Sequence, residues 1–231
     1  MHRLATWHLL AFCVLVWGTT WYAITFQLGH ASPEVGVALR FALAGLAVLA
    51  MCAWRGQPLR FTRVEHVRLA WQGAFLYGVS YICVYHAERH IASGLVAVGY
   101  SASPLVAGLG ARVLFGVPTS GRFVLGGVLG IAGVALIFRP EFGNAAGSSS
   151  ALLGVLFTVA SVLLSTIGSL AASRNAVYGL PMWPALGYGM VYAAAVCAGI
   201  ALLQGQSLVP DTAAVSLPSW WISLLYLALA G

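Results

Sequence analysis

Long apolar runs alternate with short polar gaps along the whole chain. A helix of about 20 apolar residues crosses the hydrocarbon core of a bilayer, where helices and closed barrels alone satisfy the backbone. Seven runs fit this pattern and predict membrane-spanning helices at residues 7–28, 35–51, 69–85, 91–115, 123–138, 151–172 and 183–203. An eighth run begins at Trp220 and extends only to Gly231, so we expect it to be the start of an incomplete span.

The stretch 140–150 is the longest polar break in the first two thirds of the chain, and it contains a proline, two glycines and three serines. These residues favour turns over helices, so we predict that this stretch connects two halves of the molecule. Residues 1–139 then form the first half with five spans. Residues 151–231 form a second, incomplete half.

The arginines predict the orientation of the helices, because positive residues in short loops stay on the cytoplasmic side. If the N-terminus is cytoplasmic, the cytoplasmic segments hold eight of the eleven arginines: Arg3, Arg55, Arg60, Arg63, Arg68, Arg112, Arg122 and Arg174. The outer loops hold only Arg89 and Arg139. Four of the five acidic residues also fall outside, namely Glu34, Glu88, Glu141 and Asp211.

Composition leads to the same class of protein. Apolar residues make up 61% of the chain and charged residues 7%, whereas soluble domains have about 25% charged residues. The net charge of +6 comes from arginines in short gaps, without a basic stripe, so nucleic acid is not a predicted partner. The four cysteines are far apart and form no CxxC pair, which predicts neither a disulfide framework nor a zinc site.

Arg40 is the only charged residue well inside a predicted span. Ionisable groups within the membrane often mark a substrate or ion pathway, so Arg40 is a candidate for a water-filled cavity that attracts an anionic substrate. The alternative is structural: the side chain reaches the outer interface, or pairs with a backbone carbonyl or a neighbouring helix.

Hydroxyl residues recur every three or four positions in the span 151–172 and just beyond it. This spacing places Thr158, Ser161, Ser165, Ser169 and Ser173 on one helical face. Ser161 and Ser165 are therefore candidates for one wall of a cavity. The alternative is that these hydroxyls bond to their own backbone or to another helix.

Two other spans supply further candidates. The span 91–115 contains Tyr100, Ser101, Ser103 and Pro104, and the proline frees a carbonyl in mid-span. Interrupted helices are frequent at transporter sites, although a packing kink is the alternative. In the span 7–28, the residues Trp17, Thr20 and Trp21 lie too deep for both indoles to belong to an interfacial belt. We expect these residues to line an aromatic cavity, and the alternative is that the two rings pack in the core.

Motifs for catalysis are missing from the sequence. His86, Glu88 and His90 occur in the order H-A-E-R-H, which differs from the H-E-x-x-H pattern of a zinc protease. We therefore predict that the protein is not an enzyme and needs no metal or cofactor. Gly126 and Gly130 have GxxxG spacing, which predicts close helix packing within one bundle; a homodimer motif is the alternative.

Four short segments, taken in order, resemble the EamA-like family of the drug/metabolite transporter superfamily. They are Val16–Thr20, Leu39–Phe41, Ser103–Leu105 and Gly126–Phe138. The resemblance implies ten helices in two five-helix repeats, the second inverted in the membrane, and export or exchange of small metabolites, amino acids or drugs. The second repeat would begin near Ala151 and place Pro181 near the position of Pro33.

Two features depart from that family's pattern. The family commonly has a Leu-Gly-Glu-Arg turn after its fourth helix, whereas this chain has Leu114-Phe115-Gly116-Val117-Pro118, without the acid. Helices nine and ten and most of helix eight are missing, so we expect this stretch not to transport by itself.

The sequence therefore predicts an all-α integral protein of the inner or plasma membrane with a cytoplasmic N-terminus. The expected function is transport, in the outward direction, of a small molecule by alternating access. The rival hypothesis is a non-transporting membrane interaction protein, or a truncated paralogue that packs through its small-residue faces.

Overall fold

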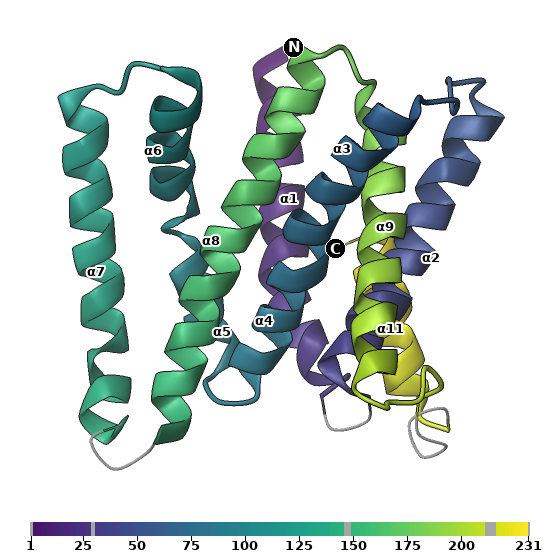
Figure 1. Cartoon of the computed structure of the whole chain (residues 1–231). Helices are drawn as coiled ribbons and strands as arrows, with labels where there is room; N and C mark the ends of the chain where they lie inside the picture. Colours follow the sequence, from purple (N-terminus) through teal and green to yellow (C-terminus); the bar gives the residue numbers. More distant parts are fainter. Residues whose placement is uncertain (1, 29–30, 146–148, 211–215, 231) are drawn as a thin grey trace.

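The computed structural model describes residues 2–28, 31–145, 149–210 and 216–230, and every regular element in these ranges is a helix. The helices stand side by side in a bundle (Figure 1). In chain order they are α1 (His2–Thr25), α2 (Pro33–Trp54), α3 (Arg63–Gly73), the π-helical segment η1 (Ala74–Val79), α4 (Ser80–Glu88), α5 (Ser93–Tyr100), α6 (Ser103–Phe115), α7 (Gly121–Ala145), α8 (Ser149–Val177), α9 (Met182–Leu203) and α11 (Pro218–Leu229).

Five of the described helical stretches are long and apolar enough to cross a membrane. They are Trp7–Thr25, Pro33–Trp54, Ser93–Phe115, Ser150–Val177 and Met182–Leu203. These five coincide with predicted spans. The apolar stretches Gly121–Ile137 and Pro218–Leu229 are shorter. The predicted span 69–85 is helical throughout, as the continuous series α3, η1 and α4.

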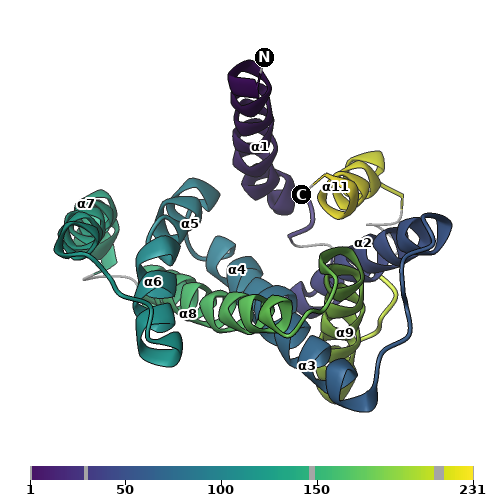
Figure 2. The ribbon, with the colours of Figure 1, turned by 90° about the horizontal axis from the view of Figure 1, so that it is seen from above.

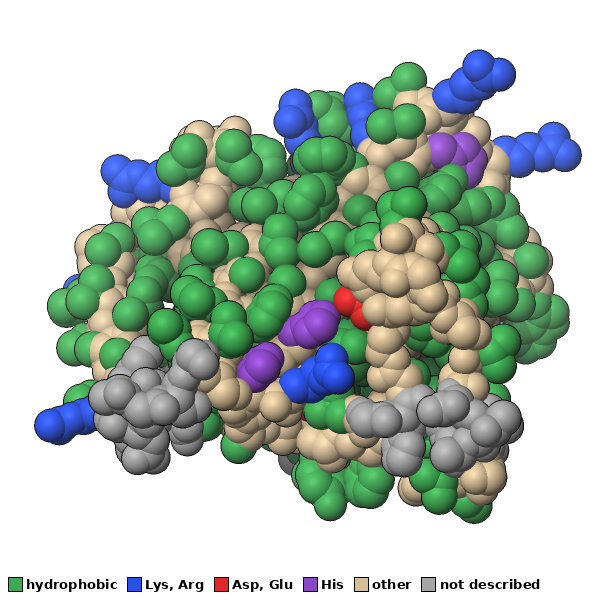
Figure 3. Space-filling model, turned by 60° about the horizontal axis from the view of Figure 1, so that its bottom comes forward, with side chains coloured by type: hydrophobic (Ala, Val, Ile, Leu, Met, Phe, Trp, Pro, Cys, Tyr) green, Lys and Arg blue, Asp and Glu red, His purple; other side chains and the backbone are tan. Residues whose placement is uncertain are grey.

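The two ends of the bundle differ in charge. The start of α1 and the ends of α2, α6 and α8 lie at one end, and the ends of α1, α4, α7 and α9 lie at the other (Figure 1). Most arginines project from the first of these ends, while hydrophobic side chains cover much of the remaining surface (Figure 3). Large apolar side chains such as Leu9 and Phe12 are 66% and 64% exposed, as expected of a surface that faces lipid.

Viewed from above, α7 and α1 lie at the periphery, while α8, α4, α3 and α9 form a central row (Figure 2). The main apolar core joins this row to α2 and α11, with buried residues such as Val37, Val84 and Leu227. By sequence α8 belongs to the predicted second half, but it packs against α3, η1, α4 and α6 of the first. The two halves are therefore interleaved.

A capping box starts α3 at the arginine-rich end. The Thr62 N–H donates to Glu65 Oε2 at 2.7 Å, and the Glu65 N–H donates to Thr62 Oγ1 at 3.4 Å. The Thr62 N–H and the Thr62 hydroxyl both donate to the Glu65 carboxylate and hold the pKa of Glu65 below its ordinary value. The contribution of this carboxylate to stability is therefore present at neutral pH and is lost as the pH falls through that lowered pKa.

The helices α2 and α9 have the same length and the same ends. Each has 22 residues and begins at a proline, Pro33 as the first residue of α2 and Pro181 as the N-cap of α9. Each is followed by a left-handed glycine, Gly56 with φ 65° and Gly205 with φ 72°. The N–H of the glutamine after each glycine donates, at 2.9 Å, to a carbonyl five residues earlier, as in a Schellman motif. The two helices run in opposite directions (Figure 1).

Glycines allow the central helices to touch backbone to backbone. A Cβ added to Gly73 of α3 would overlap the Gly189 carbonyl of α9, whose carbon lies 2.6 Å away. A Cβ at Gly45 of α2 would lie 2.9 Å from the Gly187 carbonyl oxygen of α9. In contrast, a Cβ at Gly126 or Gly130 of α7 would meet nothing within 4 Å. The predicted close packing of this GxxxG pair is therefore not seen in the part of the chain that the structure describes.

We expect Gly73→Ala to destabilise the protein by about 1–3 kcal/mol, because the added methyl group overlaps backbone that has no room to move. Unfolding of the purified protein in mild detergent, followed by tryptophan fluorescence, measures this loss. Gly130→Ala is the matched control, and it should leave stability unchanged or raise it, because alanine favours a helix over glycine. Equal stability of the two variants would contradict the close contact.

Candidate functional site

The fourth predicted span is interrupted in its middle. The helix α5 ends at Tyr100, residues 101 and 102 form a turn, and α6 begins at Ser103. Pro104 lies in the first turn of α6, where its missing N–H is tolerated, and it removes a helical donor for the Tyr100 carbonyl. The break therefore exposes backbone and hydroxyl groups at a depth where lipid offers them no partner.

A cavity of about 310 Å³ lies beside this break. Its walls come from η1, α4, α5, α6 and α8, and the lining residues are Leu76, Tyr77, Tyr81, Tyr100, Ser103, Pro104, Ala107, Ser165, Thr166 and Ser169. We call this space the tyrosine cavity. It brings together four of the residues singled out in the sequence, Tyr100, Ser103, Pro104 and Ser165. The π-helical segment η1 forms part of the wall, in keeping with the frequent occurrence of π-bulges at functional sites.

Three buried hydroxyl groups of the tyrosine cavity have no hydrogen-bond partner among the described residues. They are Tyr100 Oη, Ser103 Oγ and Thr166 Oγ1. Leaving a buried hydroxyl unpaired costs about 1–3 kcal/mol. Three such groups around one cavity favour a polar occupant that can accept and donate hydrogen bonds.

The hydroxyl stripe of α8 is largely bonded to its own helix. Ser161 Oγ donates to the Thr158 carbonyl at 2.8 Å, and Ser165 Oγ donates to the Val162 carbonyl at 3.1 Å. Ser161 is fully buried, whereas Ser165 lines the tyrosine cavity and keeps its acceptor lone pairs. The Tyr100 side chain interacts with both serines, although their geometry does not form hydrogen bonds.

Arg40 lies behind the tyrosine cavity rather than in it. Its side chain is only 2% exposed, and the guanidinium carbon lies 4.8 Å from the ring centroid of Tyr81 and 5.2 Å from that of Phe41. The Tyr81 ring contacts the Arg40 cation on one side and lines the cavity on the other. The charge of Arg40 therefore makes the cavity more positive.

Glu88 is a second ionisable residue near Arg40, and the sequence pattern assigned it to an outer loop. The structure buries it at the end of α4, with both carboxylate oxygens unpartnered. It interacts electrostatically with Arg40. Helical periodicity could have marked this face of η1 and α4 in the sequence. Its residues recur at spacings of four, four and three: Tyr77, Tyr81, Tyr85 and Glu88.

The residues of α1 are divided between two faces. Trp21 packs on Tyr100, with ring centroids 5.1 Å apart, and so reaches the tyrosine cavity from behind. Thr20 is buried and donates to the Trp17 carbonyl at 2.8 Å. The Trp17 indole is 66% exposed on the outer face, and Ser101 is also exposed. The structure brings neither of these two side chains to the cavity.

His86 and His90, at and just beyond the C-terminal end of α4, contact neighbouring helices. His86 Nε2 lies within hydrogen-bond distance of Glu34 Oε1 of α2, at 3.2 Å, and the His86 ring stacks on Phe157 of α8 with centroids 5.1 Å apart. His90 bonds to Ser150 of α8 at 2.9 Å. These contacts join α2, α4 and α8.

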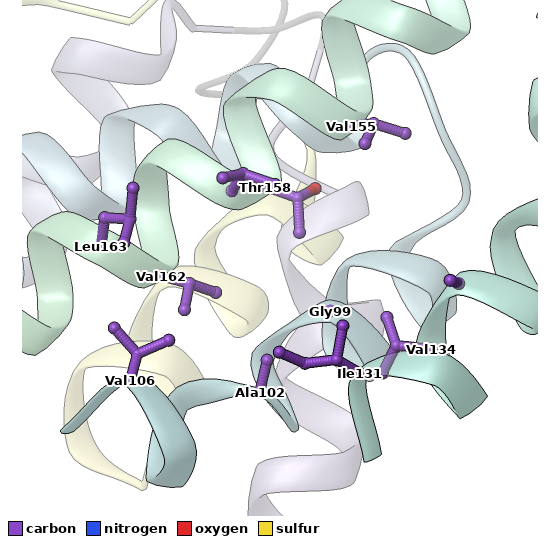
Figure 4. Close-up of a pocket in the computed structure, with 11 residues that line it drawn as sticks. Gly99, Ala102, Val106, Ile131, Val134, Val155, Thr158, Val162 and Leu163 are labelled. Atoms are coloured by element: carbon purple, nitrogen blue, oxygen red, sulfur yellow. The ribbon is translucent and has the colours of Figure 1, made fainter. Parts of the chain in front are cut away.

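A second cavity, of about 300 Å³, is enclosed by α5, α6, α7 and α8 (Figure 4). Val155, Thr158, Val162 and Leu163 of α8 face Ile131 and Val134 of α7 across it (Figure 4). The only lining hydroxyl, that of Thr158, donates to the Gly154 carbonyl of its own helix at 2.8 Å. Among the described residues that line it, this cavity therefore has no free polar group with which to orient a polar molecule. The tyrosine cavity is thus the candidate site.

The apolar bundle and its interrupted helix define a multi-pass membrane protein. A model of the EamA-like transporter family matches residues 5–139. The uncharacterized inner membrane transporter YedA of Escherichia coli (strain K12) is 30% identical over 223 residues, which cover 94% of this chain and 67% of YedA. The chain belongs to the EamA-like transporter family, and the resemblance in its sequence is thereby confirmed.

Two further comparisons concern length and fold. An uncharacterized transporter of Archaeoglobus fulgidus is 26% identical over 173 residues, covering 73% of this chain. The matched region spans 59% of that protein. A solved crystal structure shares the fold with a TM-score of 0.65 and 21% identity, over 94% of this chain and 71% of that one.

We expect cysteines placed at Ser103 and Ser165 to react with a small polar thiol reagent, because both positions line the tyrosine cavity. The background should lack the four native cysteines. Thr158→Cys is the matched control in the apolar cavity and should react at least tenfold more slowly, because a polar reagent enters an apolar space poorly. Equal rates at all three positions would contradict a polar, accessible tyrosine cavity.

Proposed function

We propose that the protein transports a small polar molecule across the membrane and that the tyrosine cavity binds this molecule. The observation that carries the proposal is the set of three unpartnered hydroxyl groups beside an interrupted membrane helix. Membership of a transporter family supports it. Amino acids, other small metabolites and drugs are the substrate classes we propose, and the direction we propose is outward.

Transport by alternating access fits the composition of the cavity wall. Tyr100 and Ser103 come from the first predicted half, whereas Ser165 and Thr166 come from the second. A movement of one half against the other would therefore change the cavity directly, as in transporters whose site lies between repeats.

We further propose that the two halves are inverted repeats, with boundaries at residues 139 and 151. The equal lengths, proline starts and glycine ends of α2 and α9 support this proposal, and so do their opposite directions. In this arrangement α2 and α9 are the second helices of the two repeats.

Flux into liposomes tests the function of the tyrosine cavity. We expect the full-length protein to move at least one compound of a panel of amino acids, neutral aromatic metabolites and cationic drugs. The double variant Ser103→Ala/Thr166→Val should reduce that flux about tenfold or more, because two hydrogen bonds worth roughly 1 kcal/mol each are lost.

The control is Ser173→Ala on the same α8 helix, where the hydroxyl is exposed and bonds to its own backbone. This variant should transport as well as the unchanged protein. Folded protein that moves none of the panel would favour the rival function, a membrane interaction protein without transport. Equal losses in the two variants would contradict the assignment of the site.

We also propose that the N-terminus and the arginine-rich end of the bundle face the cytoplasm in the inner membrane, because arginine is retained on that side. Paired cytoplasmic and periplasmic reporters, fused after residues 58, 118 and 179, test this orientation. The cytoplasmic reporter should be active at all three positions. An active periplasmic reporter at any one of them would contradict it, and a fusion after residue 208 serves as the outer control.

A further inference from the structure

A groove opens at the arginine-rich end of the bundle, outside the tyrosine cavity. It has a volume of about 530 Å³ and lies between α3, α6 and α8. The lining residues are Val67, Arg68, Trp71, Leu114, Phe115, Ile167, Leu170, Ala171, Arg174, Asn175 and Tyr178. We call it the arginine groove. Two cations stand at one end of it, and most of the remaining wall is apolar.

Both arginines of the groove contact the same phenol. The Arg68 guanidinium carbon lies 4.1 Å from the ring centroid of Tyr178, and Arg174 Nε donates to Tyr178 Oη at 3.1 Å. Two cations held against one ring repel each other. An anion between them would offset this repulsion and could accept several of their N–H groups.

The neighbouring acids do not neutralise this pair. In the part of the chain that the structure describes, neither arginine forms an ion pair with a carboxylate. Glu65 of α3 interacts with Arg68 at longer range, but its carboxylate accepts hydrogen bonds from Thr62. The groove therefore keeps a net positive charge.

The position of Arg68 is fixed by a buried contact between α3 and α8. Asn175 Nδ2 donates to Gln72 Oε1 at 2.8 Å and to the Arg68 carbonyl at 3.4 Å. Asn175 is 4% exposed, so these bonds are shielded from solvent. The backbone that carries the two arginines is thus held in place before any anion binds.

The remaining wall suits a hydrocarbon chain. Val67, Trp71 and Leu114 are 69%, 58% and 65% exposed, on helices that run along the membrane-spanning bundle. Trp71 and Tyr178 lie close to the end of the bundle, where aromatic side chains favour the level of the lipid headgroups. A free inorganic anion would leave this apolar wall uncovered.

We propose that the arginine groove binds an anionic phospholipid, with its phosphate between Arg68 and Arg174 and an acyl chain along Trp71 and Ile167. Planar guanidinium groups bind phosphate through paired hydrogen bonds. Basic pockets between spans near the membrane surface recognise anionic headgroups in this way. This inference does not depend on the proposed transport function.

Quenching of tryptophan fluorescence by phosphatidylglycerol with brominated chains tests the proposal, because bromine quenches an indole that it touches. The full-length protein in mixed micelles should show a saturable response that brominated phosphatidylcholine does not produce. The double variant Arg68→Gln/Arg174→Gln should bind roughly 30-fold more weakly, since each arginine near a membrane surface contributes about a five- to sixfold factor. The conservative variant Trp71→Phe should lose the saturable quenching, because it removes the indole that the acyl chain touches while leaving both arginines to bind the lipid phosphate.

The matched control is Arg55→Gln/Arg60→Gln, which removes the same charge from exposed arginines at the same end of the bundle. Its affinity should stay within about twofold of the unchanged protein, because neither side chain lines the groove. Equal weakening of the two double variants would show diffuse surface attraction and overturn the proposal. Glycerol phosphate, which has no acyl chains, tests whether the chains contribute to binding. If it displaced the brominated lipid completely at the same concentration, a free anion would suffice and the proposal would also be overturned.

Discussion

The constraint on which this structure depends is that lipid offers no hydrogen bonds to a polar group. Every departure from a regular helix within the bundle must therefore face protein or a wet cavity. The turn at residues 101 and 102 and the π-helical segment Ala74–Val79 are two such departures. Both border the tyrosine cavity. The hydroxyl-lined cavity of the bundle is thus located beside irregular backbone.

The same constraint explains the surroundings of Arg40. A buried guanidinium needs either a carboxylate or an electron-rich surface, and this one has the ring faces of Phe41 and Tyr81. Glu88 lies close enough to interact with it, but its oxygens form no hydrogen bond in the described part of the chain. Arg40 therefore acts on the tyrosine cavity only through the Tyr81 ring, which contacts the guanidinium and lines the cavity.

Much of the helical layout was predictable, because runs of apolar residues leave few alternatives in a chain with so little charge. The candidate site was predictable in part. Tyr100, Ser103, Pro104 and Ser165 were found through proline chemistry and helical spacing, and they line one cavity. The periodicity that found the α8 stripe could not distinguish a serine that lines the cavity, such as Ser165, from one that is fully buried outside it, such as Ser161.

Other parts of the site depend on tertiary packing. Tyr77, Tyr81 and Thr166 line the cavity because η1 touches α8 at Gly168, where an added Cβ would overlap the backbone of Leu76. No local pattern reveals that contact. Trp17 was predicted to line a cavity because of its depth in the span, but its indole faces outward. Depth does not decide this, because a rotation of α1 by one residue moves a side chain from the core to the outer face.

The interleaving of the two predicted halves has a mechanical consequence. Because α8 packs on α3, η1, α4 and α6, the predicted second half supplies a wall to a cavity whose other walls belong to the predicted first half. The close pairing of α2 with α9 joins the same halves elsewhere through Gly45 and Gly187, which leave almost no room for sliding. Backbones in direct contact cannot yield as side chains do, and α8 also makes such a contact, where Gly168 meets the backbone of Leu76. The softer contacts of α8 are those that side chains make around the two cavities. If α8 moves against the helices on which it packs, the walls of these cavities are therefore the parts that change shape.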